Sequence, residues 1–232
     1  MLAQRLSSAW TQFWMRYAGL GMSGRIATYL AAAASPPYKD RRHLAFMNKK
    51  GYISPRASIL HDNLKLGNHV FISDGVIVYK GQGGGLVDIG SGVAIHNGVI
   101  IEVGAGGSLM IGGDTHIQPR CQFSAYKGSI MIGSNVQIAP NCGFYPYNHG
   151  FASDALIKEQ PLKSRGDIVV ADDAWLGFGV IVLDNVRIGK GAVIGAGSVV
   201  VTDIPDGAIA VGSPARVVRM RSKTDCIAEG AI

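Results

Sequence analysis

The sequence predicts an all-β fold, a parallel β-helix built from six-residue units, and three observations point to it. Large aliphatic residues recur every six positions along most of the chain. Small residues occupy one fixed place in the unit, and glycine is about twice as frequent as usual, at 32 of 232 residues. A six-residue unit is too short for a pair of helices and matches the hexapeptide β-helix among known repeat periods.

The repeat is clearest towards the C-terminus, where five units follow one another without interruption. They begin at Val170, Leu176, Val182, Ile188 and Ile194. The other nine units begin at Ile53, Leu66, Ile72, Ile89, Ile95, Ile111, Ile117, Ile132 and Ile138. The fifth residue of every unit is small: Ala57, Val70, Val76, Val93, Val99, Thr115, Cys121, Val136, Cys142, Ala174, Val180, Val186, Ala192 and Ser198. Because alternate strand residues face the same side, these positions predict a narrow, stacked interior. Glycine often follows the aliphatic residue, as expected at a tight corner.

Extra residues between the units are predicted to widen one corner of the coils, because they recur at the same place in successive coils. The one large interruption, residues 145–167, exceeds the usual length of an unstructured loop in a compact domain, so we expect it to be functional. The sequence therefore divides into a basic, amphipathic helical segment (residues 1–50), a β-helical domain (51–221) that contains this loop, and a C-terminal tail (222–232).

Charge and cysteine content exclude several classes of protein. The net charge is +6, but residues 51–215 carry −3, and the excess lies in residues 1–50 (+7) and 216–232 (+2). A groove for nucleic acid needs a stripe of Lys and Arg that the middle of the chain lacks. The three cysteines show no C-x-x-C spacing, which favours a reduced, cytoplasmic setting, and no run of 18 apolar residues could span a bilayer.

The segments VADDAWLGFGVIVLDNVRIGKGAVIGAGSV and IGAGSVVVTDIPDGAIAVGSPARVVRMR make residues 53 to about 221 resemble the hexapeptide-repeat acyltransferases. The resemblance is to sugar and polysaccharide O-acetyltransferases of the maltose and galactoside type. It implies a left-handed β-helix, a homotrimer with its sites between subunits, acetyl-CoA as the acyl donor, and no metal.

His149 is the candidate catalytic residue. It lies in the sequence Tyr-Asn-His-Gly at the start of the long loop, where the resemblance implies a histidine general base. The chemistry fits, because an alcohol attacks a thioester poorly until a base near neutral pKa takes its proton.

The resemblance also implies binding residues. The coenzyme would contact Ala196, Gly197, Phe178, Arg216 and Arg219, with the two guanidinium groups near its phosphates. The acceptor would contact Gln118, Asn141 and Trp175. The family commonly has Thr-Lys where this chain has Val201-Thr202, and an Asn where it has Gln118.

The other histidines, and the cysteines Cys121 and Cys142, are interpreted as structural residues without a catalytic or metal-binding role. His43 and His61 lie outside good repeats, and His69, His96 and His116 occupy outward or corner positions, so all five are expected to be solvated. They lack the spacing of a three-histidine zinc site. Cys121 and Cys142 fill small inward positions and are expected in the core.

Residues 1–50 leave two interpretations open. Apolar residues at helical spacing define one face: Leu2, Leu6, Ala9, Trp10, Phe13, Trp14 and Tyr17. With the basic residues nearby, this face could lie on an anionic membrane surface. Alternatively, the helix covers the open end of the solenoid.

The sequence thus predicts an acetyl-CoA-dependent sugar O-acetyltransferase of surface polysaccharide or glycan assembly, cytoplasmic or peripheral at the inner face of the membrane. N-acetylation of an amino sugar and a non-catalytic β-helical scaffold are the alternatives. The sugar, the hydroxyl position and the residue that orients His149 are left open.

Overall fold

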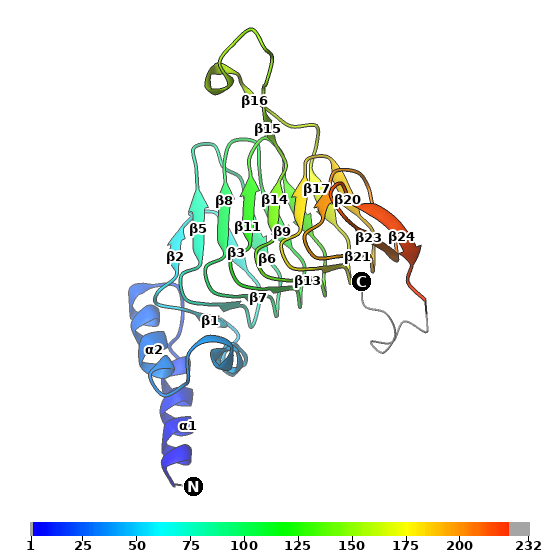
Figure 1. Cartoon of the computed structure of the whole chain (residues 1–232). Coiled ribbons are helices and arrows are strands. Elements are labelled where there is room, and N and C mark those ends of the chain that lie inside the picture. The colour runs from blue at the N-terminus through cyan, green and yellow to red at the C-terminus, as the bar shows by residue number, and fades with distance from the viewer. Residues whose placement is uncertain (1, 223–232) are drawn as a thin grey trace.

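The computed structural model describes residues 2–222 and shows a left-handed parallel β-helix of triangular cross-section, as predicted (Figure 1). Each coil contributes one short strand to each of three sheets, named A, B and C. The predicted tail 222–232 lies outside the described residues apart from its first residue, and so does Cys226.

The strands of the three sheets follow one another in the order A, B, C along the chain. Sheet A holds β1 (Tyr52–Ile53), β4 (Phe71–Ile72), β7 (Ala94–Ile95), β10 (His116–Ile117), β13 (Gln137–Ile138), β18 (Trp175–Leu176), β21 (Val193–Ile194), β23 (Ala208–Val211) and β24 (Arg216–Met220). Sheet B holds β2 (Ser58–Leu60), β5 (Ile77–Lys80), β8 (Ile100–Val103), β11 (Gln122–Ala125), β14 (Gly143–Tyr145), β19 (Ile181–Leu183) and β22 (Val199–Val200). Sheet C holds β3 (Leu64–Leu66), β6 (Val87–Ile89), β9 (Leu109–Ile111), β12 (Ile130–Ile132), β17 (Ile168–Val170) and β20 (Val186–Ile188).

The elements outside the coils are few. Before them come the helices α1 (Leu2–Met15) and α2 (Met22–Ala32) and the 3₁₀ segment η1 (Tyr38–Met47). The long loop carries a hairpin of β15 (Asn148–His149) and β16 (Leu162–Lys163), with a short 3₁₀ turn, η2 (Ile157–Glu159), at its far end.

The register stacks equivalent repeat positions directly on one another. In sheet C, Ile132 pairs with Val170, which pairs with Ile188. All fourteen predicted small residues are buried, and so are thirteen of the fourteen aliphatic residues; Leu66, in the first full coil, is partly exposed. Each buried aliphatic side chain contributes about 1.5–3 kcal/mol through the hydrophobic effect. The stacked interior therefore stabilises the coils against one another.

Glycine occurs at the corners for two reasons: neighbouring coils approach closely there, and the backbone is left-handed at some positions. At Gly133, which follows Ile132, a Cβ would come within 2.6 Å of the Asp172 backbone nitrogen in the next coil, so the close approach of the coils excludes a side chain. Two positions further along the corner the backbone turns left-handed, as at Gly98 (φ +68°). Asn135 and Asn141 adopt the same conformation, which asparagine tolerates better than most residues.

The three corners of the triangle form edges that run along the solenoid, and each is named by the sheets that it joins. The turns between sheets B and C, residues 81–86, 104–108, 126–129 and 146–167, form the BC edge. All the extra residues of the repeats lie there, which confirms the prediction that one corner is widened. Figure 1 shows these turns along one side of the solenoid, with the β15–β16 hairpin rising from it.

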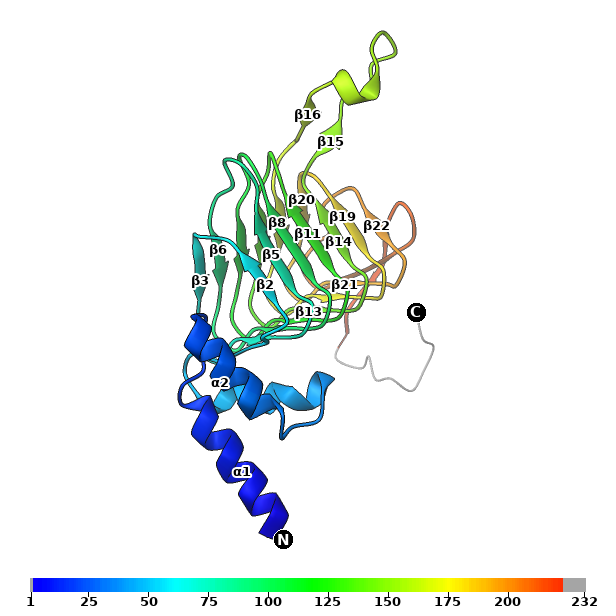
Figure 2. The same cartoon turned by 90° about the vertical axis from the view of Figure 1, so that its left-hand side faces the viewer.

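The N-terminal helices pack on the outer face of sheet A at its first strands, on the side opposite the hairpin in both views (Figures 1 and 2). Their shared core joins Met15 and Leu44 to Tyr52, Phe71 and Ala94 of β1, β4 and β7. The segment thus lies mainly along the side of the solenoid. At the open end, Ile59, Leu64 and Leu66 stay partly exposed.

The buried face of α1 is not the apolar face that the sequence indicated. Thr11, Met15 and Ala18 are buried, whereas Trp10, Phe13 and Tyr17 are 47%, 49% and 60% exposed. Met15 and Ala18 share a hydrophobic core with Ala31 of α2, and the Thr11 hydroxyl donates to the Ala31 carbonyl at 3.5 Å. Trp14 packs against this core partly buried, and the other three aromatic residues are left at the surface. Within residues 2–222, no helix combines the length and the apolar character needed to cross a membrane.

Candidate active site

His149 lies at the base of the hairpin that projects from the BC edge. The backbone of β15 runs antiparallel to that of β16, with His149 opposite Leu162, and the imidazole is exposed. Among the described residues of this single chain, its ring makes no hydrogen bond or ion pair. The ring is therefore free to accept a proton from a molecule bound beside this edge.

The outer part of the loop is held together by Gln160. Its side-chain amide donates to the carbonyl oxygens of Ala152 and Ala155 at 2.8 and 2.9 Å and accepts from the Ala152 backbone N–H at 2.8 Å. The Gly150 N–H donates to the Pro161 carbonyl at 3.2 Å. These bonds give an exposed loop a defined shape.

The base of the hairpin is anchored to the next coil by a buried carboxylate, Asp184, between β19 and β20. Its side chain is 1% exposed and accepts hydrogen bonds from Asn148 Nδ2 at 2.9 Å and from the backbone N–H, Nε and Nη2 of Arg165 at 2.8–3.1 Å. Burial opposes ionisation, but the bonds from Arg165 and Asn148 outweigh it and hold the pKa of Asp184 below its usual range. No sequence pattern indicated these three residues.

Five of the predicted binding residues lie along the edge between sheets A and B, the AB edge. These are Gln118, Asn141, Phe178, Ala196 and Gly197. Phe178 and Gly197 are on neighbouring coils, and the Gly197 N–H donates to the Phe178 carbonyl at 2.8 Å. Ala196 and Gly197 are exposed, and a Cβ at Gly197 would meet no atom within 4 Å. This edge therefore offers a flat strip that an extended ligand could follow.

The other predicted binding residues lie close to that strip or at the end of the solenoid. Trp175 is in β18, between Gln137 and Val193 of the neighbouring strands, and is 49% exposed. Arg216 and Arg219 are exposed on β24, which adds an antiparallel strand to sheet A beside β23.

Within one chain, the structure does not bring His149 together with the residues of the AB edge. Sheet B runs from the AB edge to the BC edge, so the two groups lie at opposite ends of its strands (Figure 1). A ligand bound along the AB edge of a chain therefore lies apart from the His149 of the same chain.

One predicted surface histidine is buried, which corrects the expectation that it is solvated. His96 is 3% exposed, because η1 covers the start of sheet A and brings Tyr38 against the imidazole. Burial, together with the nearby charges of Lys39 and Arg42, lowers the pKa of His96 to about 4. His116 is half-buried, and Nη2 of Arg42 lies 2.6 Å from its Nε2. Burial and this guanidinium lower the pKa of His116.

The two described cysteines are in the core, as predicted. Cys121 and Cys142 are buried, and each thiol lies within hydrogen-bonding distance of the Ala139 carbonyl, at 3.2 and 3.1 Å. Contact with Cys142 and burial raise the pKa of Cys121. A thiol held in this way is a poor nucleophile.

Polar and aromatic side chains cover the outer face of sheet B next to the hairpin. The Tyr145 hydroxyl donates to Gln122 Oε1, and the Ser124 hydroxyl lies 3.2 Å from that of Tyr147. The ring of Tyr145 covers Gly143, where a Cβ would approach it to 3.1 Å. No repeat indicated these residues in the sequence, because the sheet B strand of each coil precedes a turn of variable length.

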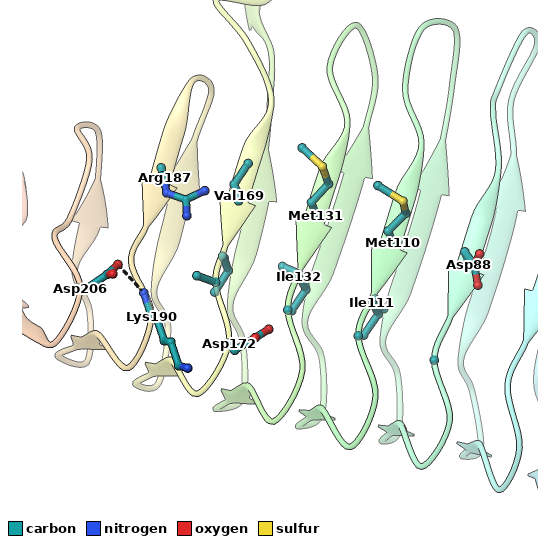
Figure 3. A pocket seen from close by; sticks show the side chains of 15 residues that line it. Asp88, Met110, Ile111, Met131, Ile132, Val169, Asp172, Arg187, Lys190 and Asp206 are labelled. Carbon is teal, nitrogen blue, oxygen red and sulfur yellow. Dashed lines mark hydrogen bonds between the residues drawn. The ribbon is translucent and has the colours of Figure 1, made fainter.

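A shallow groove of about 660 Å³ lies on the outer face of sheet C (Figure 3). Met110, Met131 and Val169 form its apolar floor, with Asp88 towards one end and Arg187 towards the other. None of the residues predicted to bind coenzyme or acceptor lines it. Across residues 2–222, no three His, Cys, Asp or Glu side chains are grouped so that they could hold a metal ion.

Comparison with known proteins agrees with the repeat and the fold. Residues 167–202 match the family described as "Bacterial transferase hexapeptide (six repeats)". A 69-residue segment is 48% identical to a galactoside O-acetyltransferase of Lactococcus lactis and covers 28% of this chain and 33% of the relative. A 60-residue segment is 38% identical to a 2,3,4,5-tetrahydropyridine-2,6-dicarboxylate N-acetyltransferase of Staphylococcus aureus and covers 26% of this chain and 25% of the relative. The matched segments thus span at most a third of these two relatives.

Solved structures resemble this fold over a longer part of the chain than the sequence matches cover. A mutant of AntD, an N-acyltransferase from Bacillus cereus solved in complex with dTDP and coenzyme A, superposes with a TM-score of 0.54. The match covers 80% of this chain and 91% of that one at 23% identity, which establishes a common architecture.

Taken together, the repeat and the stacked coils define a left-handed β-helical protein of the hexapeptide type. In the matched segments and in its coils, the chain is similar to the hexapeptide-repeat acyltransferases.

Proposed function

We propose that this protein is an acetyl-CoA-dependent O-acetyltransferase that acts on a sugar hydroxyl in surface polysaccharide or glycan assembly. The observation that carries the proposal is His149, an exposed imidazole on an anchored hairpin where the long loop interrupts the coils. In this proposal, His149 removes the proton of the acceptor hydroxyl as its oxygen attacks the thioester carbonyl. Backbone N–H groups stabilise the oxyanion, and coenzyme A leaves as the thiol after taking up the proton. No acyl-enzyme and no metal take part.

The AB edge is the proposed coenzyme site. Ala196 and Gly197 leave room for the pantetheine arm beside Phe178, and Arg216 and Arg219 would approach the phosphates. The coenzyme A complex of the AntD mutant supports a coenzyme site on this fold. Gln118, Asn141 and Trp175, on or beside the same edge, are the proposed acceptor contacts.

Because His149 and the AB edge lie apart within one chain, we propose that each active site is shared between two subunits of a homotrimer. His149 on the BC edge of one subunit would face the AB edge of the next. A cyclic trimer supplies three such pairs with one kind of contact.

The exposed aromatic residues of α1 and of the turn that follows it support the proposal of a peripheral membrane contact through residues 1–50. Trp10, Phe13 and Tyr17 lie in a segment of charge +7, as expected of a helix that binds an anionic surface. A cytoplasmic enzyme held in this way would work beside lipid-linked acceptors.

The test is incubation with labelled acetyl-CoA and a panel of candidate glycans. We expect label in a product from which mild base releases acetate, because an ester is cleaved under these conditions. A base-stable product would instead support the second candidate, N-acetylation of an amino sugar, which the Staphylococcus aureus relative favours. Absence of acetyl-CoA binding in a calorimetric titration would overturn both and leave a β-helical scaffold.

A further inference from the structure

Both arms of the hairpin that carries His149 are tied to the coils through one buried side chain, Asp184. Asn148, directly before His149, and Arg165, which follows β16, are on the two arms of the hairpin. Both donate to Asp184, which lies in a corner of the next coil. The arms are therefore tied to the same buried point.

The geometry leaves the carboxylate of Asp184 fully engaged. Oδ1 accepts from Asn148 Nδ2 and Arg165 Nη2, and Oδ2 accepts from the backbone N–H and Nε of Arg165. Nη2 of Arg165 also donates to the Asp184 carbonyl at 3.0 Å. A charge-assisted, bidentate pair of this kind fixes orientation as well as distance.

Burial makes this arrangement costly to break. The Asp184 side chain is 1% exposed, whereas that of Arg165 is 62% exposed, so the carboxylate depends on these partners and the guanidinium does not. A buried carboxylate left without its donors is strongly destabilising. The hairpin base is thus held in one position, although the rest of the loop is solvated.

We propose that Asp184 is the positioning residue of the catalytic histidine: through Asn148 and Arg165 it fixes the backbone at His149 so that the imidazole meets the acceptor hydroxyl. This inference rests on the proposed function, since it assigns His149 the role of base. Asp184 touches neither the imidazole nor any reacting atom, so it acts only through its neighbours.

The test compares two variants of the clamp that Asp184 forms with Asn148 and Arg165, namely Asn148→Ala and Asp184→Asn, with the parent protein. Asp203→Asn is the matched control. Asp203 also accepts a hydrogen bond from a backbone N–H at the BC edge, that of Arg187 at 2.8 Å, but none of its bonds reaches the hairpin. The first readout is hydrogen–deuterium exchange of residues 146–167. We expect faster exchange in the two clamp variants and no change in the control.

The second readout is acetyl transfer to the acceptor found with the glycan panel. We expect kcat to fall about tenfold to hundredfold in both clamp variants, because a displacement of about 1 Å has effects of that size. The KM for acetyl-CoA should stay within about twofold, since the AB edge is untouched. A variant that had only lost stability would lower the amount of active enzyme and leave the kcat per folded site unchanged.

The outcomes separate this inference from the proposed function. If the parent acetylates an acceptor and both clamp variants keep parental kcat and exchange, Asp184 has no positioning role although the proposed function stands. If the parent transfers no acetyl group at all, the proposed function and the catalytic role of the clamp both fail.

Discussion

His149 and His96 show how the same side chain acquires different properties on one solenoid. His149 is exposed on a hairpin, whereas His96 is enclosed between η1 and sheet A with Nδ1 lacking a hydrogen-bond partner among the described residues. Both are polar residues in or next to repeat positions, so the repeat pattern alone could not distinguish them. The distinction comes from η1, whose packing depends on side chains far away in the sequence.

The burial of His96 predicts a loss of stability in acid. Its pKa is about 4 in the folded protein and near 6.5 in the unfolded chain. Between these values the unfolded chain binds a proton that the folded protein excludes, so the free energy of unfolding falls as the pH drops from 6.5 to 4. We expect His96→Gln to lose about 2–3 kcal/mol less than the parent between pH 7 and pH 4.5.

Denaturant unfolding of both proteins at the two pH values measures this difference. Glutamine suits the site, because Gln118 holds the equivalent corner position one coil further on. Identical pH dependence of the free energy of unfolding in both proteins would mean that His96 binds a proton equally well in the folded protein and in the unfolded chain.

Among the helices and strands, α1 differs most from the prediction, because its buried face is not its most apolar face. Thr11 and Met15 are buried against α2, whereas Phe13 remains exposed in edge-to-face ring contacts. Its ring centroid lies 5.2 Å from that of Trp14 and 5.6 Å from that of Tyr17. Helical spacing identified the apolar residues but not which of them would be buried, since small residues decide how closely two helices approach.

We expect this aromatic surface to bind anionic membranes. A full-length Trp10→Ser/Phe13→Ser variant should lose most of its sedimentation with vesicles of phosphatidylserine and phosphatidylcholine, because amphipathic aromatic side chains anchor a helix at the interface. Phe151→Ser removes an aromatic residue of 83% exposure from the long loop and is the control. Equal sedimentation of the parent and the double variant would exclude α1 as the contact.

In the molecule as a whole, the features that the sequence predicted correctly are those that depend on the six-residue repeat. The coils, the widened BC edge and the buried small residues such as Cys121 and Val136 follow from a six-residue period that each coil reinforces. The anchor at Asp184 could not be found in this way, because Asn148 and Arg165 reach it across 36 and 19 residues from a segment without periodicity. Proximity of that kind appears only once the coils are stacked.

Because the AB and BC edges lie apart within one chain, we predict that two inactive variants recover acetyl transfer when they assemble together. His149→Ala disables the BC edge, and Ala196→Trp should block the AB edge. Coexpressed in equal amounts, they should form mixed trimers in which about one of the three sites combines two intact edges.

If the two variants carry different affinity tags and only trimers with both tags are purified, activity should return to about a third of the parental value. If the mixed protein were no more active than either variant alone, the active site would not be shared between subunits in the way proposed.

The most direct test of the proposed function is acetyl transfer by His149→Ala, measured together with coenzyme A binding by calorimetry. We expect the rate to fall by about 10²- to 10⁴-fold, because a general base contributes that much. Coenzyme A affinity should be unchanged, and His43→Ala, which removes another exposed histidine, should keep parental activity. A folded His149→Ala protein that binds coenzyme A and transfers acetyl groups within a few-fold of the parental rate would show that His149 is not the general base.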